Sequence, residues 1–352
     1  MLIKNRSFSK KIKMISGILP SFLKIFIYKM MGAEIGKGVR IGFGSVVIGE
    51  KIKIGEFSKI SMFTYIRGRE IKIGRYVSIG SQTVIDTEKI EIDDDAKITE
   101  QVFIGGLSSP DSLLKMGKRT TIMKMSFINT TKPVVIGDDT GVGGHCLLFT
   151  HGSWQNKLEG YPVAFAPISL GKNVWLPWRI FIMPGVSIGD GCTIGADSLV
   201  TKDIPAGSLA AGSPAKVIKT AEEYPKKLTF EEKNNTMVNI LEEFIAYLSY
   251  NGLNIDSEKK KESYCSKILT GNSEYRLNYY NSELMEENLK NLNKNTFLLS
   301  LKNIPKDLRI KMTQSSIMWA DLYSKERNGT NNIGEETLKY LSRYGIRFDR
   351  TD

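Results

Sequence analysis

A six-residue repeat centred on a large aliphatic residue runs through the first two thirds of this 352-residue chain. Neither an α-helix, with 3.6 residues per turn, nor a strand with alternating side chains has a period of six. The repeated positions are Ile35, Ile41, Ile48, Ile54, Ile60, Ile66, Ile73, Ile79, Ile85, Ile92, Ile98 and Ile104, then Ile136, Val142 and Leu148, and finally Leu170, Leu176, Ile182, Ile188, Ile194 and Val200. The period therefore excludes ordinary helical and strand-based domains for this region.

The period indicates a triangular coil in which each side is a short strand and each corner a turn, with about 18 residues per circuit. The aliphatic residue, and a small or branched residue four positions later, both point inward, and successive coils stack at the strand spacing of about 4.8 Å. Glycine follows many of the isoleucines, and we expect it to permit the corner backbone. The 21 repeated positions predict about seven coils. A hydrophobic content of 41% is sufficient for such a core.

Two stretches interrupt the repeat. The first, residues 106–133, contains Lys115, Lys118, Arg119 and Lys124 and is predicted to leave the prism as a lid or a subunit contact. The second runs from Gly152 to about Pro167. We predict that it is a substrate loop, and it carries the aromatic residues Trp154, Tyr161 and Phe165. Aromatic residues on a loop indicate packing against a neighbouring chain or coverage of a ligand.

The chain contains only two histidines, His145 and His151. A reaction that needs a neutral imidazole near pH 7 must use one of them. His151 stands where the second excursion begins, and it is our candidate for a general base. His145 occupies the same place one rung earlier, so it is expected on an adjacent side of the prism, in a surface or supporting role next to the site.

The chain resembles the hexapeptide-repeat acyltransferases in three features. These are the repeat, the loop with its Tyr161-Pro162 pair, and the segments 173–186, 188–198, 200–205 and 210–217. The resemblance covers roughly residues 20–220 and is closest to the O-acetyltransferase and xenobiotic acetyltransferase branch. It implies a left-handed parallel β-helix and a homotrimer with active sites between subunits. It also implies that His151 is the catalytic residue and that acetyl-CoA is the acyl donor, with no metal.

Carried over by position, the resemblance assigns coenzyme A contacts near the end of the repeat. Gly195 and Ala196 would face the pantetheine, Thr201 and Lys202 the phosphates, and Ser213, Pro214 and Lys216 the adenine end. Coenzyme A is strongly anionic, so lysines beside tight turns would supply counter-charge. The chain departs from the family at Pro177-Trp178-Arg179, where the bulk of Trp178 is expected to narrow the groove or to shape it for a particular acyl group.

The favoured function is a coenzyme A-dependent O-acyltransferase, most simply an O-acetyltransferase, acting on a sugar hydroxyl of a cell-surface polysaccharide or its precursor. Three alternatives stay open. They are an N-acyltransferase on an amino sugar nucleotide, a γ-type carbonic anhydrase, and an inert trimeric scaffold. The carbonic anhydrase site binds zinc through three histidines from two subunits, whereas this chain has two histidines.

Both ends of the chain differ from the repeat domain, which is expected over residues 34–220. Residues 1–33 form a basic arm, because residues 1–31 hold seven lysines and arginines and no acidic residue. Most of the +11 net charge lies there, so no nucleic-acid partner is expected. The spacing of Ile15, Leu19, Phe22, Phe26 and Met30 predicts an amphipathic helix, either a cap on the prism or a peripheral contact with an anionic membrane. Lys24 and Lys29 make the helix too polar to span a bilayer.

Residues 222–352 are expected to form a small mixed α/β domain for acceptor recognition or assembly. Its predicted elements are helices over 230–250 and 335–344 and strands over 297–301 and 317–323. Three cysteines without a pairing pattern, and no secretory leader, indicate a reducing compartment. The expected location is the cytoplasm or the inner face of the membrane.

Overall fold

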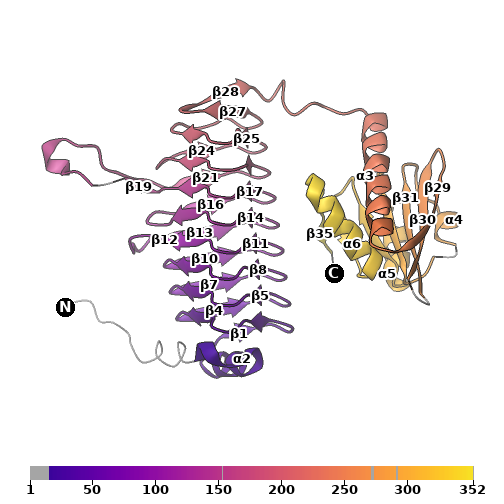
Figure 1. The fold of residues 1–352 in the computed structure, drawn as a ribbon, viewed down its shortest axis with the longest axis horizontal. Helices are drawn as coiled ribbons and strands as arrows, with labels where there is room; N and C mark the ends of the chain where they lie inside the picture. The colour runs from indigo at the N-terminus through magenta and orange to yellow at the C-terminus, as the bar shows by residue number, and fades with distance from the viewer. Residues whose placement is uncertain (1–15, 153, 271–272, 291, 352) are drawn as a thin grey trace. The chain divides into compact units, whose positions relative to one another are not determined.

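The computed structural model describes residues 16–152, 154–270, 273–290 and 292–351. The chain divides into two compact units between Lys226 and Lys227. The first unit is a stack of coils and the second a seven-stranded sheet with helices (Figure 1). Within the described ranges, no helix is both long enough and apolar enough to cross a bilayer.

The first unit has three parallel sheets, one for each side of the coil. The first face contains β1 (Glu34–Ile35), β4 (Lys51–Ile54), β7 (Glu70–Ile73), β10 (Lys89–Ile92), β13 (Leu113–Met116), β16 (Val134–Ile136), β21 (Ile168–Leu170) and β24 (Ser187–Ile188). The second face contains β2 (Arg40–Ile41), β5 (Lys59–Ile60), β8 (Ser78–Ile79), β11 (Lys97–Ile98), β14 (Thr121–Ile122), β17 (Gly141–Val142), β22 (Trp175–Leu176), β25 (Thr193–Ile194), β27 (Leu209–Gly212) and the antiparallel β28 (Ala215–Lys219). The third face contains β3 (Val46–Ile48), β6 (Tyr65–Arg67), β9 (Val84–Asp86), β12 (Phe103–Gly105), β15 (Phe127–Asn129), β18 (Leu147–Leu148), β23 (Phe181–Ile182) and β26 (Leu199–Val200). The expected parallel β-helix with three faces is therefore confirmed.

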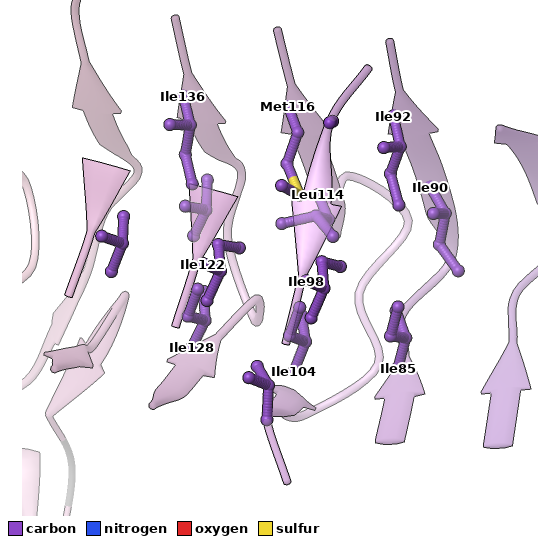
Figure 2. Close-up of a cluster of buried hydrophobic side chains, with 14 of the residues drawn as sticks. Ile85, Ile90, Ile92, Ile98, Ile104, Leu114, Met116, Ile122, Ile128 and Ile136 are labelled. Atoms are coloured by element: carbon purple, nitrogen blue, oxygen red, sulfur yellow. The ribbon is translucent and has the colours of Figure 1, made fainter. Parts of the chain in front are cut away.

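The repeated positions form the core as predicted. Ile66, Ile79 and Ile85 have no exposed surface, and equivalent side chains from successive coils stack in the interior (Figure 2). The small residues also point inward, and the polar ones are satisfied by the backbone of the next coil. Ser58 Oγ donates to the Gly74 carbonyl at 2.7 Å, for example. Inward hydroxyl groups at these repeat positions are tolerated where they find such acceptors, as Ser45, Ser58, Thr64 and Thr83 do.

The structure gives a different reason for the glycines of the repeat from the corner conformation that we expected. The corner residues with positive φ are mostly not glycine, as at Phe57 (57°) and Tyr76 (57°). The glycines after the isoleucines instead lie against the next coil, and a Cβ at Gly80 would lie 2.4 Å from the Thr99 carbonyl carbon. Close stacking of coils, and not backbone freedom, therefore requires glycine at these positions.

The prediction that residues 106–133 leave the prism is wrong. β13, β14 and β15 form a further coil, with Met116, Ile122 and Ile128 fully buried in the core (Figure 2). Register shows that 24 residues separate Ile92 from Met116, against 19 from Ile73 to Ile92, so the insertion is short. The first and third faces accordingly have eight strands each, and not the seven coils expected.

The N-terminal helix α2 (Ser21–Met30) packs on the first coil, and Ile15 of the predicted stripe lies outside the described residues. Tyr28 is fully buried in the core cluster, which fits the predicted cap. The predicted apolar stripe does not face the prism, because Phe22, Phe26 and Met30 are 61–73% exposed. Lys24 points inward, where its Nζ donates to the carbonyls of Gly42 and Ser45. The backbone carbonyls at the open end of the prism thus favour a positively charged side chain, Lys24, on the buried face of α2.

The second unit has strand order β29-β30-β31-β32-β33-β34-β35, with β31, β32 and β33 parallel. Its strands are β29 (Asn254–Lys259), β30 (Ser263–Thr270), β31 (Ser273–Tyr280), β32 (Thr296–Ser300), β33 (Met318–Asp321), β34 (Glu326–Asn328) and β35 (Asp349–Arg350). Its helices are α3 (Phe230–Tyr250), α4 (Glu286–Leu289), α5 (Lys306–Gln314) and α6 (Asn332–Leu341). Two separate clusters of buried side chains form its core, one including residues of α3 and α6 and the other residues of α5. The predicted helix over 230–250 and the two predicted strands are observed.

Candidate active site

His151 lies where the chain leaves the edge between the third and first faces. On three successive coils this edge carries Gly105–Gly106, Asn129–Thr131 and Thr150–His151, since each segment lies at or just after the end of a strand of the third face. β19 (His151–Gly152) then pairs with β20 (Ala164–Phe165) in an antiparallel ladder that forms the base of the extruded loop. The imidazole is therefore held between a rigid coil and a two-stranded ribbon.

Two contacts orient the imidazole. His151 Nδ1 lies 3.4 Å from Thr131 Oγ1, and its ring stacks on Phe165 with centroids 5.6 Å apart. Thr131 Oγ1 also accepts the Leu107 amide at 3.0 Å, so the short insertion fixes the hydroxyl group. The second ring nitrogen, Nε2, has no hydrogen-bond partner among the described residues.

Beneath the imidazole is a buried polar network. Thr150 Oγ1 donates to the Asn129 carbonyl (3.0 Å) and contacts Asn129 Oδ1 at 2.9 Å, while Lys132 N donates to Thr150 Oγ1. The Lys132 ammonium lies 2.9 Å from Asp111 Oδ2. Hydrogen bonds from the Ser109 hydroxyl and from Lys132 hold the pKa of Asp111 below its usual value. These side chains form the floor and rim beside His151.

Sequence reasoning missed Asn129, Thr131 and Thr150 as neighbours of the histidine. The sequence pattern predicts residues 106–133 outside the prism, and that prediction does not place Thr131 one coil below His151. The signal that reveals this placement is the continued spacing of six from Met116 to Ile122 and Ile128. Because Met116 replaces isoleucine at the first of these positions, the spacing is not recognised as part of the repeat.

The extruded loop includes the short 3-10 helix η2 (Lys157–Glu159) and presents apolar side chains to solvent. Trp154 is 98% exposed and Leu158 95% exposed. Tyr161 and Phe165 are about half-exposed, and only Phe165 touches His151 through an aromatic contact. Within one chain, the tip of the loop therefore has no packing partner in the described residues.

His145 lies on a different edge, between the second and third faces, because it falls between β17 and β18. It is the corner residue of its coil, with φ of 55°, and its ring lies 5.7 Å from that of Trp178. The structure therefore does not bring the two histidines together, in agreement with the expected placement on adjacent sides.

The residues predicted to bind coenzyme A are divided between these two edges. Thr201 and Lys202 follow β26, and so lie on the edge that carries His151. Those on the edge of His145 are Trp178, Gly195, Ala196 and the β27–β28 turn with Ser213 and Pro214. Lys216 follows as the second residue of the return strand β28. Except for Gly195, which is half-buried, all are exposed at the surface. A single chain therefore does not gather them around His151.

The departure at Pro177-Trp178-Arg179 has a structural setting. The Trp178 ring covers Gly144 of the preceding coil, where a Cβ would lie 2.3 Å from the ring. Arg179 pairs with Asp197 of the following coil through Nε at 2.6 Å and Nη2 at 2.7 Å. The bulky residues thus connect three coils along this edge, and Trp178 remains 42% exposed.

The outer surface of the third face, between the two edges, carries a column of aromatic rings. Phe103, Phe127, Phe149 and Phe181 stack at centroid distances of 5.0, 5.2 and 5.3 Å. An apolar column on a sheet surface is typical of a face that another protein surface covers.

Chemically, the edge of His151 offers an imidazole with one nitrogen held by a hydroxyl group and the other without a partner among the residues that the structure describes. This arrangement suits the transfer of a proton to or from a substrate atom. The nearby coils supply exposed lysines and backbone amides for an anionic ligand.

Known proteins provide a comparison for this arrangement, although no family model matches the chain. The galactoside O-acetyltransferase of Escherichia coli (strain K12) is 38% identical over 102 residues, which is 28% of this chain and 50% of that protein. The chain spans half or less of the length of the curated relatives that it matches.

Similar solved structures include a galactoside acetyltransferase in complex with coenzyme A, 27% identical, covering 40% of this chain and 70% of that one with a TM-score of 0.29. A polySia specific acetyltransferase, NeuO, is 23% identical and covers 55% of this chain and 84% of that one with a TM-score of 0.31. The homologues of this chain are acetyltransferases, and its structural neighbours include hexapeptide-repeat acetyltransferases.

Proposed function

We propose that this protein is an acetyl-CoA-dependent O-acetyltransferase that acts on a sugar hydroxyl of a cell-surface polysaccharide or its precursor. The observation that carries the proposal is the placement of His151 on the edge of a β-helix, with Nδ1 facing Thr131 and Nε2 without a hydrogen-bond partner in the described part of the chain. Similarity to acetyltransferases of sugars supports the choice of reaction.

In the proposed mechanism, Nδ1–H donates to Thr131 Oγ1 and leaves the lone pair of Nε2 for the acceptor hydroxyl. As Nε2 takes the hydroxyl proton, the sugar oxygen attacks the thioester carbonyl carbon and forms a tetrahedral intermediate. Backbone amides stabilise the negative oxygen of the intermediate. The carbon–sulfur bond then breaks, the imidazolium returns its proton to the sulfur, and the products are the acetyl ester and free coenzyme A.

The division of site residues between two edges supports a homotrimer. His151 and the predicted pantetheine contacts Gly195 and Ala196 lie on opposite edges of the third face, so a complete site would combine the edges of two chains. The exposed Trp154 and Leu158 at the loop tip, and the aromatic column, are surfaces that a second copy would cover. Light scattering coupled to size-exclusion chromatography tests this, and a monomer with full activity would contradict it.

Coenzyme A would then lie along the last coils, with Lys202 and Lys216 near its phosphates and adenine end and Trp178 shaping the groove. Residues 34–220 would form the catalytic domain. Residues 222–352 would serve acceptor recognition.

The exposed side chains of the N-terminal helix support the proposal of a peripheral contact with the inner face of a membrane. Ile18, Phe22, Phe26 and Met30 are 61–73% exposed along α2 and the turn before it. The basic excess of residues 1–31 suits anionic lipid. Cosedimentation with liposomes of anionic lipid, but not with neutral liposomes, is expected. Phe22→Ser/Phe26→Ser should abolish cosedimentation.

The central experiment measures coenzyme A release from acetyl-CoA with a panel of glycans, next to acetyl-CoA binding in the absence of acceptor. Release with at least one carbohydrate is expected. Mild alkali should remove the acetyl group from the product, since an ester is labile and an amide is not. An alkali-resistant product would indicate N-acylation. Absence of acetyl-CoA binding by the folded protein would overturn the proposal.

A further inference from the structure

A crevice of about 890 Å³ opens in the C-terminal unit where three parallel strands end. Tyr280 of β31, Ser300 of β32 and Asp321 of β33 are paired in register at this edge. The crevice is lined by the loops that follow these strands and by the first turn of α3. In sheets with parallel strands, ligands commonly bind just outside the carboxyl ends of the strands. The volume is also within the usual range for small-ligand sites.

The lining of the crevice is cationic. Lys233 comes from α3, Lys302 from the loop after β32 and Lys325 from the loop after β33. Glu283 is the one acidic residue among the described lining residues. Its carboxylate is 79% exposed and lies 3.9 Å from Lys302 Nζ, so this pair is weak. Lys233 and Lys325 have no salt bridge within the described part of the chain. The crevice therefore attracts anions.

Two helix N-termini lie at the same place. α3 begins at Phe230, where Thr229 and Glu232 already cap its first turn, whereas α5 begins at Lys306 directly after Pro305, which also lines the crevice. Pro305 provides no side-chain cap for α5. The amides of the first turn of α5 and its helix dipole favour negative charge at this end, which adds to the effect of the lysines.

A buried carboxylate fixes the loops around the crevice. Asp321 is fully buried, and it accepts hydrogen bonds from the amides of Ile304 (2.8 Å), Tyr323 (2.8 Å) and Ser324 (3.0 Å). Its charge is balanced by Arg309 Nη2 at 2.6 Å. One side chain thus ties the loop after β32 to the loop after β33. The crevice is therefore preformed, which lowers the entropic cost of binding a ligand.

Aromatic rings stand beside the cations. Phe230 is 49% exposed and Tyr323 75% exposed, and Lys302 Nζ lies 5.8 Å from the centroid of the Phe230 ring. Exposed rings next to ammonium groups suit a ligand that combines an anionic group with an apolar C–H face. A sugar ring bearing a carboxylate or phosphate group has both features.

We propose that this crevice binds a negatively charged saccharide. Its identification as the acceptor glycan, held here by a carboxylate or phosphate group, rests on the proposed acetyltransferase function. The binding itself follows from the crevice alone.

The test uses the full chain without acetyl-CoA, in low salt because surface charges are screened at high ionic strength. Its affinity is measured for hexagalacturonate, for maltohexaose with a terminal phosphate and for neutral maltohexaose. At least one anionic hexamer should bind at least tenfold more tightly than the neutral one, and which of the two binds identifies the anionic group. K233Q/K302Q/K325Q should weaken that binding about tenfold, which corresponds to about 1.4 kcal/mol. K233R/K302R/K325R should retain it.

A charge-matched control separates the crevice from general attraction. Lys261, Lys290 and Lys294 are exposed lysines of the same unit that do not line the crevice. Their triple glutamine variant should bind within twofold of the wild type, and equal losses in the two triple variants would overturn the proposal. Equal affinity of the wild type for all three hexamers would overturn it too. Failure of the acetyltransferase function would instead appear as absent coenzyme A release while saccharide binding persists.

Discussion

Replacement of His151 tests the proposed chemistry most directly. A general base contributes about 10²–10⁴-fold in rate, or about 2.7–5.4 kcal/mol of transition-state stabilisation at 1.36 kcal/mol per tenfold. The contacts of His151 are few, because its ring has one aromatic contact with Phe165 and one 3.4 Å contact with Thr131. Their loss should therefore cost about 1 kcal/mol or less of folding free energy. His151→Asn should lose at least a hundredfold in kcat and keep its fold.

His145 supplies the matched control. It has a ring contact with Trp178 and a positive φ of 55°, which asparagine tolerates well. His145→Asn should therefore keep kcat within about threefold of the wild type, because His145 is not the proposed base, and its contact with Trp178 should confine any effect to the KM for acetyl-CoA.

Coenzyme A release is measured with a thiol reagent, and the background from the protein should be low. Cys146 and Cys192 are buried, and burial raises the pKa of all three cysteine thiols. Denaturation in urea checks folding of each variant. If His151→Asn keeps more than a tenth of the wild-type kcat, or if both histidine variants lose activity equally, the assignment of the base is refuted.

Three further predictions concern the support of the site and the stack. Thr131→Val should lower kcat about tenfold by releasing His151 Nδ1, whereas Thr131→Ser should keep it; equal kcat values for the two variants would contradict an orienting role. Gly80→Ala should destabilise the fold by about 1–3 kcal/mol in urea denaturation, because its Cβ would meet backbone at 2.4 Å, whereas Gly152→Ala, with open space, should change stability by less than about 0.5 kcal/mol. Burial raises the pKa of Cys146 from 9.0 to about 11, so the folded state binds more protons between these values, and stability should fall as pH rises from about 9 to 11. Cys146→Ala should reduce that slope, and an unchanged slope would show that the thiol does not contribute.

The sequence alone was sufficient for the fold of the repeat region, since a period of six with inward aliphatic residues has few physical solutions. The prediction was wrong where a different residue type occupies a repeated core position. Met116 is fully buried at a position that isoleucine fills in other coils, and without isoleucine there the sequence assigns an entire coil to an insertion. It failed again at Lys24, because apolar spacing along a helix cannot reveal that the surface beneath it consists of backbone carbonyls.

The candidate site was only partly predictable for a related reason. His151 could be selected as a candidate because the chain has two histidines and one stands at a break in the repeat. Its neighbour Thr131 is 20 residues away and lies beside it only through the stacking of coils. The crevice of the C-terminal unit has no local signature, since its lysines come from a helix and two separate loops.

The sequence by itself determined that this chain coils into a three-sided stack, because the spacing of its aliphatic residues allows little else. Only the tertiary structure decided which edge of the stack each polar residue occupies. Insertions of unequal length enter at the corners, and 34 residues separate Ile136 from Leu170 where 19 suffice elsewhere. Sequence distance therefore loses its relation to position around the coil, and the distribution of the predicted site residues between two edges becomes visible only when the coils are stacked.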